Sequence, residues 1–265
     1  MTVAVVVGGG IVGLHAASAL RDKGFEVFVL DAAPYPAEHT SGRNSGVIHA
    51  GIFYPPGSLK ERLCIEGNRL TYEWVKKLEV DHRPCGKWVV PEEGQEPDLG
   101  PFYEKLCRLP IPRPERVSKT VLAEREPALR SSEAIFIPST GILDAAGYVK
   151  ALARYLEERG TQVLFNCRVL EVKEHQLETS RGPIEFDLAV NAAGLWADEV
   201  AKMAGLKGYE IRPCRGDYYQ LSKQPVTRPV YHLHYKGAQG LGVHLTPTLD
   251  GQTLLAQLAQ LQGCD

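Results

Sequence analysis

The hydrophobic pattern at the start of the chain predicts a strand, a helix and a second strand. Residues 3–7 are all apolar, a glycine-rich stretch follows at residues 8–13, and an amphipathic segment then runs to residue 23. A second apolar run occupies residues 25–30 and ends at Asp31. This order is typical of a βαβ unit that binds a dinucleotide at its glycine turn.

The spacing of the glycines gives each a separate task in such a unit. Gly8 permits a tight turn, Gly10 lets the backbone approach a pyrophosphate, and Gly13 lets the helix pack closely on its strand. Open N–H groups at the start of the helix are expected to face the phosphates. Asp31 is placed to accept hydrogen bonds from a ribose diol and would repel a 2′-phosphate, which disfavours NADP.

Later segments alternate between helical and strand patterns. Helices are predicted over residues 57–80, 145–159 and 196–204, with Asp144 as an N-cap and Gly160 as the end of the second helix. Strands are predicted at residues 86–91, 134–138, 186–190, 211–221 and 242–251, and a small meander at residues 163–165, 169–172 and 177–179. Leucines 254, 255, 258 and 261 have helical spacing and predict a short helix within residues 252–265.

Composition narrows the class of protein. The 265 residues are 44% hydrophobic and 23% charged, with a net charge of -2 and no long like-charged block, which argues against a nucleic-acid surface. No apolar run is long enough to span a membrane, so we expect a cytoplasmic protein, with peripheral contact at the inner face of the membrane left open. The six cysteines form no CxxC pair or metal-type cluster, so no metal site is expected.

Two further stretches are suited to a cofactor. Residues 41–51 combine glycines with small hydroxyl and amide side chains, which can donate to phosphate or ring oxygens. Residues 186–194 form an apolar strand that opens onto Asn-Ala-Ala-Gly before a helix, a second place where backbone N–H groups can approach a ligand. Taken alone, this second stretch fits an ordinary strand-to-helix turn equally well.

Five segments together carry a resemblance to a known family. The N-terminal βαβ unit and residues 41–54, 191–198, 215–219 and 243–247 resemble FAD-dependent oxidoreductases of the D-amino-acid-oxidase fold. The most similar branch is that of the L-2-hydroxyglutarate dehydrogenases and oxidases. The resemblance implies an α/β fold in which a Rossmann-like FAD-binding domain is interleaved with an antiparallel-sheet substrate domain.

The resemblance also implies how the chain is divided. The FAD-binding domain would comprise residues 1–80 and 141–210, and the substrate domain residues 81–140 and 211–265. In that family the chain continues into a glycine-containing loop and a final helix near the flavin. Residues 256–265 lack this pattern, so we expect the C-terminal part to be missing, with the last leucines forming a helix that fills the gap or contacts a second copy.

FAD is the cofactor that the resemblance implies, bound non-covalently. The implied contacts to its ADP half and flavin are Gly8, Gly10, Ile11, Val12, Gly13, Asp31, Ala32, Ser41, Arg43, Asn44, Ser45, Gly46, Val47, His49, Val169, Ala193, Gly194 and Trp196. Related amine dehydrogenases attach FAD through a histidine in a comparable motif, which leaves a covalent role for His49 as the alternative.

Oxidation of a 2-hydroxy acid needs a base and carboxylate anchors. His49 and His244 are the candidate catalytic bases, because a histidine titrates near neutrality. Arg215 is a candidate substrate residue and Arg43 a second arginine anchor, with Lys60 a weaker choice. Tyr218 and Tyr219 alternate faces on a strand, so one should reach the substrate. A structural role is the alternative for each of these residues.

The leading hypothesis is therefore FAD-dependent oxidation of L-2-hydroxyglutarate or a similar 2-hydroxy acid by hydride transfer to flavin N5. Oxidation of a glycine derivative or of glycerol phosphate on the same scaffold is the alternative chemistry. An inactive FAD-binding remnant is the alternative without chemistry. The expected partners are the small-molecule substrate and an electron acceptor that the sequence does not identify, with a homo-oligomer contact left open.

Overall fold

The computed structural model describes residues 2–92, 94–233, 242–256 and 260–261. The chain forms two compact units, each built from two separated segments. The first unit comprises residues 1–44 and 145–213, and the second comprises residues 45–144 and 214–265. The chain thus alternates between two units in four segments, but residues 45–80, which we expected in the first unit, belong to the second.

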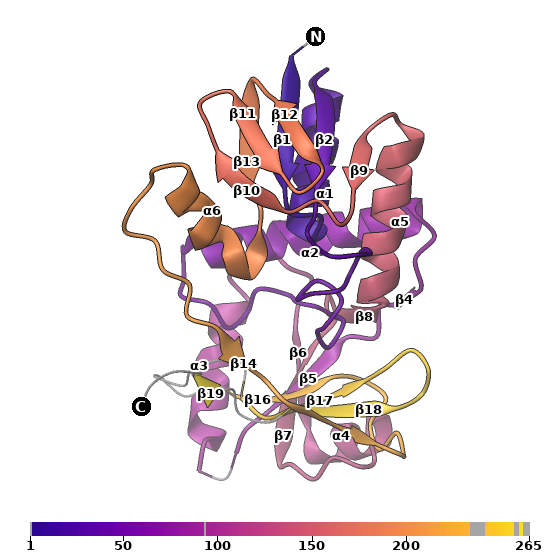
Figure 1. Ribbon diagram of the computed structural model, residues 1–265. Helices are drawn as coiled ribbons and strands as arrows, with labels where there is room; N and C mark the ends of the chain where they lie inside the picture. Colours follow the sequence, from indigo (N-terminus) through magenta and orange to yellow (C-terminus); the bar gives the residue numbers. More distant parts are fainter. Residues whose placement is uncertain (1, 93, 234–241, 257–259, 262–265) are drawn as a thin grey trace. The chain divides into compact units, whose positions relative to one another are not determined.

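A four-stranded parallel sheet forms the centre of the first unit (Figure 1). Its order is β13 (Leu188–Asn191), β1 (Val3–Val7), β2 (Glu26–Leu30) and β9 (Gln162–Leu164). Ala4, Val5 and Val6 are fully buried, as expected for an apolar strand in the interior of a parallel sheet. Helix α1 (Ile11–Asp22) connects β1 to β2, which pair in parallel, so the predicted βαβ unit is present. Helix α1 also packs against α5 (Ala145–Glu158).

The predicted meander differs in its first strand. Residues 162–164 pair in parallel with β2, and so they extend the main sheet. The antiparallel meander consists instead of β10 (Val169–Val172), β11 (Gln176–Thr179) and β12 (Gly182–Glu185). The reason is that β9 directly follows α5 through a turn at Gly160 (φ +82°), which makes it the returning strand of a second crossover. The unit is completed by the 3₁₀ turn η1 (Gly194–Trp196) and helix α6 (Ala197–Met203).

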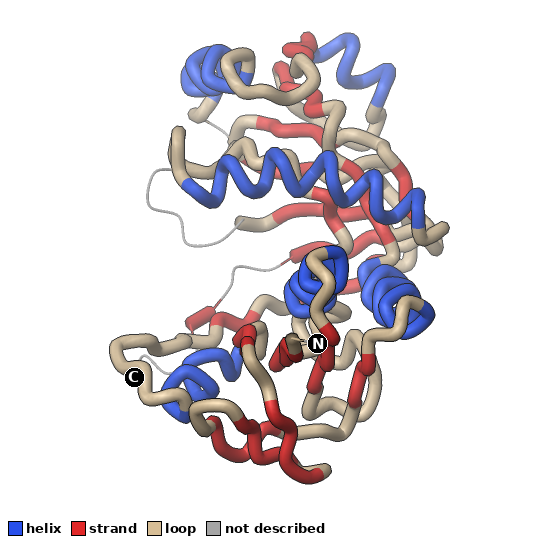
Figure 2. The backbone as a smooth tube through the Cα atoms, turned by 90° about the horizontal axis from the view of Figure 1, so that it is seen from above, coloured by secondary structure: helices blue, strands red, loops and turns tan. Residues whose placement is uncertain are grey.

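The second unit is organised around a seven-stranded sheet. Its order is β15 (Tyr218–Leu221), β18 (Thr253–Ala256), β17 (His244–Pro247), β16 (Val230–His232), β5 (Lys87–Val90), β7 (Glu133–Ile137) and β6 (Glu115–Ser118). All neighbouring pairs are antiparallel except β16 and β5, which run parallel. Figure 2, with strands in red and helices in blue, shows the separate sheets of the two units.

Smaller elements complete this unit. They are a sheet of β3 (Val47–Ile48), β8 (Gly141–Leu143) and β4 (His82–Arg83), and a two-stranded pair of β14 (Cys214–Arg215) and β19 (Gln260–Leu261). Helix α2 (Leu59–Lys77) lies within the predicted range of residues 57–80 and begins after Ser58, whose hydroxyl accepts the Glu61 N–H at 3.2 Å. Within the described residues, no helix is both long and apolar enough to cross a bilayer.

Two helices of the second unit were not predicted. They are α3 (Glu96–Leu106) and α4 (Lys119–Arg125). Gly100 and Pro101 interrupt the helical signal of α3, but Leu99 and Leu106 are fully buried in the core of this unit. Burial of its apolar side chains therefore outweighs the unfavourable local propensity.

The predicted C-terminal helix is wrong. Residues 253–256 form the strand β18, which pairs with β15 on one side and β17 on the other, and residues 260–261 form β19. Thr253 and Ala256 are buried, and the two leucines between them are partly buried. Pairing along both edges satisfies the backbone of β18, and this outweighs the helical spacing of the leucines. Leu258 lies outside the described residues, and neither role proposed for a final helix is supported.

Candidate functional site

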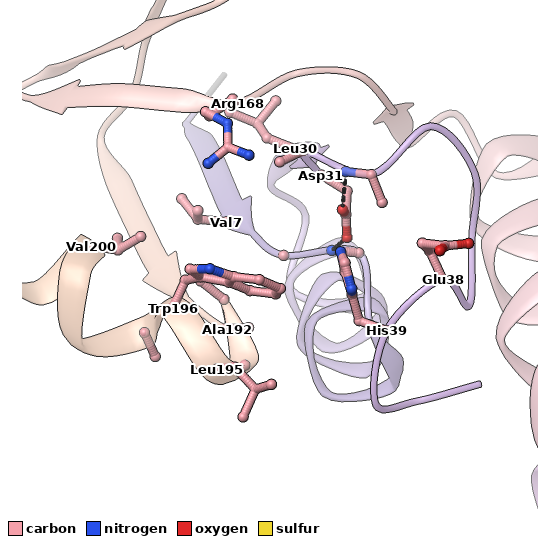
Figure 3. A pocket seen from close by; sticks show the side chains of 18 of the residues that line it. Val7, Leu30, Asp31, Glu38, His39, Arg168, Ala192, Leu195, Trp196 and Val200 are labelled. Carbon is pink, nitrogen blue, oxygen red and sulfur yellow. Dashed lines mark hydrogen bonds between the residues drawn. The ribbon is translucent and has the colours of Figure 1, made fainter. Parts of the chain in front are cut away.

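A cavity of about 640 Å³ lies in the first unit at the carboxyl ends of three parallel strands (Figure 3). Gly8 follows β1, Asp31 follows β2 and Ala192 follows β13, and all three line this cavity. Crevices at the carboxyl ends of parallel strands are where ligands bind in α/β sheets. We call this cavity the glycine-turn pocket.

Glycine is required at two positions under this pocket. Gly8 has φ +113°, and a Cβ there would lie 2.2 Å from the Ala192 carbonyl oxygen. A Cβ on Gly13 would lie 1.9 Å from the carbonyl oxygen of Gly8. Both distances are far below van der Waals contact, so these glycines hold α1 and β13 close to the end of β1. The pocket is consequently walled by backbone at this end.

Asp31 holds the glycine turn as well as facing the pocket. Its Oδ2 accepts the Gly9 N–H at 2.7 Å, and its Oδ1 accepts the Ala33 N–H at 2.8 Å, as the dashed lines in Figure 3 show. An ionised carboxylate has about four acceptor sites, so both oxygens keep capacity for another donor. A role in fixing the turn was not predicted for this residue.

The start of α1 differs in one respect from expectation. The Ile11 N–H, which we expected to face a phosphate, donates to the Ser41 hydroxyl at 3.0 Å. Ser41 therefore ties its loop to the start of the helix. The N–H groups of Val12 and Gly13 belong to the first turn, where a helix supplies no acceptor of its own. They remain the helix-end donors for an anion.

Aromatic rings form another part of the wall. The rings of Trp196 and His39 meet edge to face with centroids 4.7 Å apart, and Figure 3 shows the two side chains at the same opening. Trp196 was a predicted site residue, whereas His39 was not. Glu38 and Arg168 also line the pocket and were missed. No motif marks these three residues, because they lie in loops whose approach to the glycine turn depends on the tertiary fold.

The predicted cofactor residues divide into four groups. Those that line the glycine-turn pocket are Gly8, Gly10, Val12, Asp31, Ala32, Ser41, Val169, Ala193, Gly194 and Trp196. Ile11 and Gly13 lie beside it in α1. Arg43 and Asn44 are exposed: Arg43 pairs with Glu38 at 2.5 Å, and the Asn44 amide donates to the Thr40 and Ser41 carbonyls.

The remaining predicted cofactor residues belong to the second unit. Ser45, Gly46, Val47 and His49 lie around β3, where Val47 pairs with Ile142 of β8. Gly46 has φ +66°, and a Cβ there would lie 2.5 Å from the Leu143 carbonyl oxygen. This part of the motif is therefore a tight strand pair and does not line the glycine-turn pocket.

The two candidate bases lie together in the second unit. The ring of Tyr231 on β16 stacks on that of His244 with centroids 4.5 Å apart, and it meets the ring of His49 edge to face at 6.2 Å. Burial lowers the pKa of His49 to about 3, with smaller contributions from Lys87 and His244. This is well below the near-neutral value we expected, so His49 is an uncharged imidazole at physiological pH. The Nδ1 of His244 lies 3.0 Å from the Gly242 carbonyl oxygen.

The predicted substrate residues are on β14 and β15 of the same unit. The Tyr218 ring is edge-on to His244 with centroids 6.1 Å apart, and Tyr219 alternates to the other face of the strand. Arg215 is exposed and pairs with Asp217 at 2.9 Å. Of these three residues, the structure brings Tyr218 to the histidine pair. Among the described residues, no group of three His, Cys, Asp or Glu side chains has a metal-binding arrangement.

Residues 4–261 match the family described as FAD dependent oxidoreductase, and the chain belongs to this family. It is 34% identical to L-2-hydroxyglutarate dehydrogenase of Escherichia coli strain K12, over 97% of this chain and 64% of that protein. It is also 34% identical to the mitochondrial L-2-hydroxyglutarate dehydrogenase of Homo sapiens, over 97% of this chain and 60% of that protein. The chain thus spans less than two thirds of the length of these relatives.

Solved structures show the same fold. Glycine oxidase from Geobacillus kaustophilus superposes with a TM-score of 0.84 at 20% identity, over 99% of this chain and 72% of that one. The L-alpha-glycerophosphate oxidase from Mycoplasma pneumoniae, solved with FAD bound, gives a TM-score of 0.83 at 22% identity, over 97% of this chain and 71% of that one. The predicted fold class, with its parallel and antiparallel sheets, is confirmed.

Proposed function

We propose that this chain takes part in the FAD-dependent oxidation of a 2-hydroxy acid to a 2-oxo acid, with L-2-hydroxyglutarate as the substrate. The observation that carries the proposal is the 34% identity, over 97% of this chain, to L-2-hydroxyglutarate dehydrogenases from both a bacterium and a human. Equal identity to dehydrogenases from two such distant organisms favours the interpretation that this chain shares their substrate as well as their fold.

The glycine-turn pocket suits the ADP half of FAD. Its end wall is backbone, because a Cβ on Gly10 would lie 3.0 Å from the Ser41 hydroxyl oxygen and one on Gly9 would lie 3.0 Å from Asp31 Oδ2. A pyrophosphate can therefore approach the first-turn N–H groups of α1. The carboxylate of Asp31 retains lone pairs for ribose hydroxyls. Trp196 and Val169 supply apolar surface for the remainder of the nucleotide.

The histidine pair suits the proton side of the reaction. Oxidation at C2 removes a hydride from carbon and a proton from the hydroxyl oxygen, and the product is the 2-oxo acid. FAD, when bound, supplies the hydride acceptor. An uncharged His49 is in the state that accepts the hydroxyl proton. Tyr218 lies beside His244 and can orient the substrate.

Anaerobic reduction of the flavin tests the proposal. The whole chain, supplied with FAD, is mixed with L-2-hydroxyglutarate, and the oxidised flavin absorption is followed. We expect bleaching with this substrate and none with its D-enantiomer, glycine or glycerol 3-phosphate. Bleaching by glycine or glycerol 3-phosphate would contradict the proposal and support amine or glycerol-phosphate oxidation instead. A protein that binds no FAD, or binds it without bleaching, would be an inactive remnant.

Variants locate the base. His49→Gln and His244→Gln are expected to slow bleaching by about 100-fold or more if the altered residue accepts the proton. Acid precipitation of the FAD-loaded protein should leave the flavin in solution, because we propose non-covalent binding. Flavin that stays with the precipitated polypeptide would point to a covalent link, for which His49 is the candidate.

A further inference from the structure

Lys87 is a buried amine in the interior of the second unit. It is the first residue of β5, pairs with Ile137 of β7, and is 1% exposed. Its Nζ lies 4.7 Å from the ring centroid of Phe53 and 4.7 Å from that of Tyr231. A lysine is almost never fully buried unless its charge is compensated. Its position beside two aromatic rings therefore indicates that Lys87 has a function in this unit.

The Tyr231 ring links Lys87 to both candidate bases. His244 stacks on that ring at 4.5 Å with an interplanar angle of 9°, and the His49 ring meets it at 6.2 Å and 83°. Tyr231 itself is fully buried. Three basic side chains therefore surround one phenol ring, and all belong to the second unit. We call these residues, with Phe53, the Tyr231 cluster.

This cluster favours a single positive charge. Within the described part of the chain, Lys87 and His244 shift the pKa of His49, and the Cys64 thiol shifts that of Lys87. None of these groups is a carboxylate. Burial lowers the pKa of Lys87 to about 7, while Cys64 on α2 raises it slightly. Burial raises the pKa of the Cys64 thiol, and that of the Tyr231 phenol is also raised, so neither supplies an anion at neutral pH.

We propose that Lys87 is a positioning residue of the catalytic site, whose buried amine against Tyr231 acts together with burial to keep the imidazole of His49 uncharged and ready to accept a proton. Like charges in an apolar interior repel strongly, so a proton on Lys87 disfavours one on either histidine. The inference rests on the proposed function and deepens it, because it adds a basic neighbour to the burial that holds His49 in its basic form.

Histidine-selective NMR titration of the whole chain with FAD added tests this assignment. Signals of His49 and His244 are assigned with the two glutamine variants, and that of His49 is followed between about pH 2.5 and 9 in the wild type, Lys87→Met and Lys87→Gln. In the wild type the His49 midpoint is expected at about pH 3. In both lysine variants this midpoint should rise by about one pH unit or more.

Lys105→Met is the matched control. Lys105 is also partly buried, with its pKa lowered chiefly by burial, but its Nζ donates to the Ile52 and Tyr54 carbonyls at 3.1 and 3.0 Å. Its loss should leave the titration of His49 unchanged. An unchanged His49 curve in both Lys87 variants would overturn the assignment, as would an equal shift in the Lys105 variant. The titration requires no turnover, so its outcome is separable from failure of the flavin-reduction test.

Discussion

The glycine-turn pocket and the Tyr231 cluster are built in opposite ways. The pocket forms where adjacent strands end, and much of its wall is backbone held by bonds such as that from the Gly9 N–H to Asp31. The Tyr231 cluster consists of side chains from a loop and three strands, which are far apart in the sequence. The first depends on local chain geometry, whereas the second depends on burial of basic groups. Substitutions should therefore damage the two regions through different physical effects.

The largest expected effect concerns the pH dependence of stability in the Tyr231 cluster. Because burial depresses the pKa of Lys87 to about 7 in the folded protein, the unfolded chain binds more protons between about pH 7 and 10.4. The contribution of Lys87 to the free energy of unfolding should therefore rise with pH across this window, by roughly 4 kcal/mol. Lys87→Met should lack this rise and be more stable than the wild type near pH 7.

Urea unfolding of both proteins at several pH values between about 7 and 10 measures this difference. Titrating groups that do not interact with Lys87 affect both proteins alike, so the difference between the curves reports Lys87 together with the Cys64 thiol coupled to it. If the two stability curves run parallel, Lys87 does not change its charge in this range. The interpretation that the Tyr231 cluster offers no anion to a charged Lys87 would then be wrong.

A smaller effect is expected at the glycine-turn pocket, where backbone spacing is the vulnerable feature. Gly13→Ala places a methyl group 1.9 Å from the Gly8 carbonyl oxygen, so α1 must move away from the turn. We expect a loss of about 1–3 kcal/mol in the free energy of unfolding, together with loss of FAD from the protein on gel filtration.

Gly67→Ala is the control for this substitution. Gly67 lies inside α2, and a Cβ there meets no atom within 4 Å. Its replacement should stabilise the protein by up to about 1 kcal/mol, because alanine favours the helix. If Gly13→Ala behaves like Gly67→Ala, the close approach of α1 to the turn is not what holds the pocket together.

The same contrast explains what the sequence could predict. Gly8, Asp31 and Trp196 line the pocket. The glycine motif placed the first two and the family resemblance placed Trp196, and all three follow strands whose hydrophobic pattern is clear. Lys87 and Tyr231 carried no signal, because they meet only through the parallel pairing of β16 with β5, in which Tyr231 is opposite Val89. Lys87 is diagonal to Tyr231 on the same face of the sheet. The C-terminal helix was predicted wrongly for a related reason. Strand pairing on both edges of β18 outweighed the helical spacing of its leucines.

The smallest expected effect separates the pocket from the packing behind it. His15 on α1 and Tyr148 on α5 share a hydrogen bond of 2.8 Å between Nε2 and the phenol oxygen. Tyr148→Phe should cost about 0.5–1.5 kcal/mol in the free energy of unfolding, as for a typical buried hydrogen bond. FAD affinity, measured by fluorescence titration, should not change, because neither residue lines the pocket. A weakened FAD affinity in this variant would show that the glycine turn depends on the far face of α1 as well as on its own backbone.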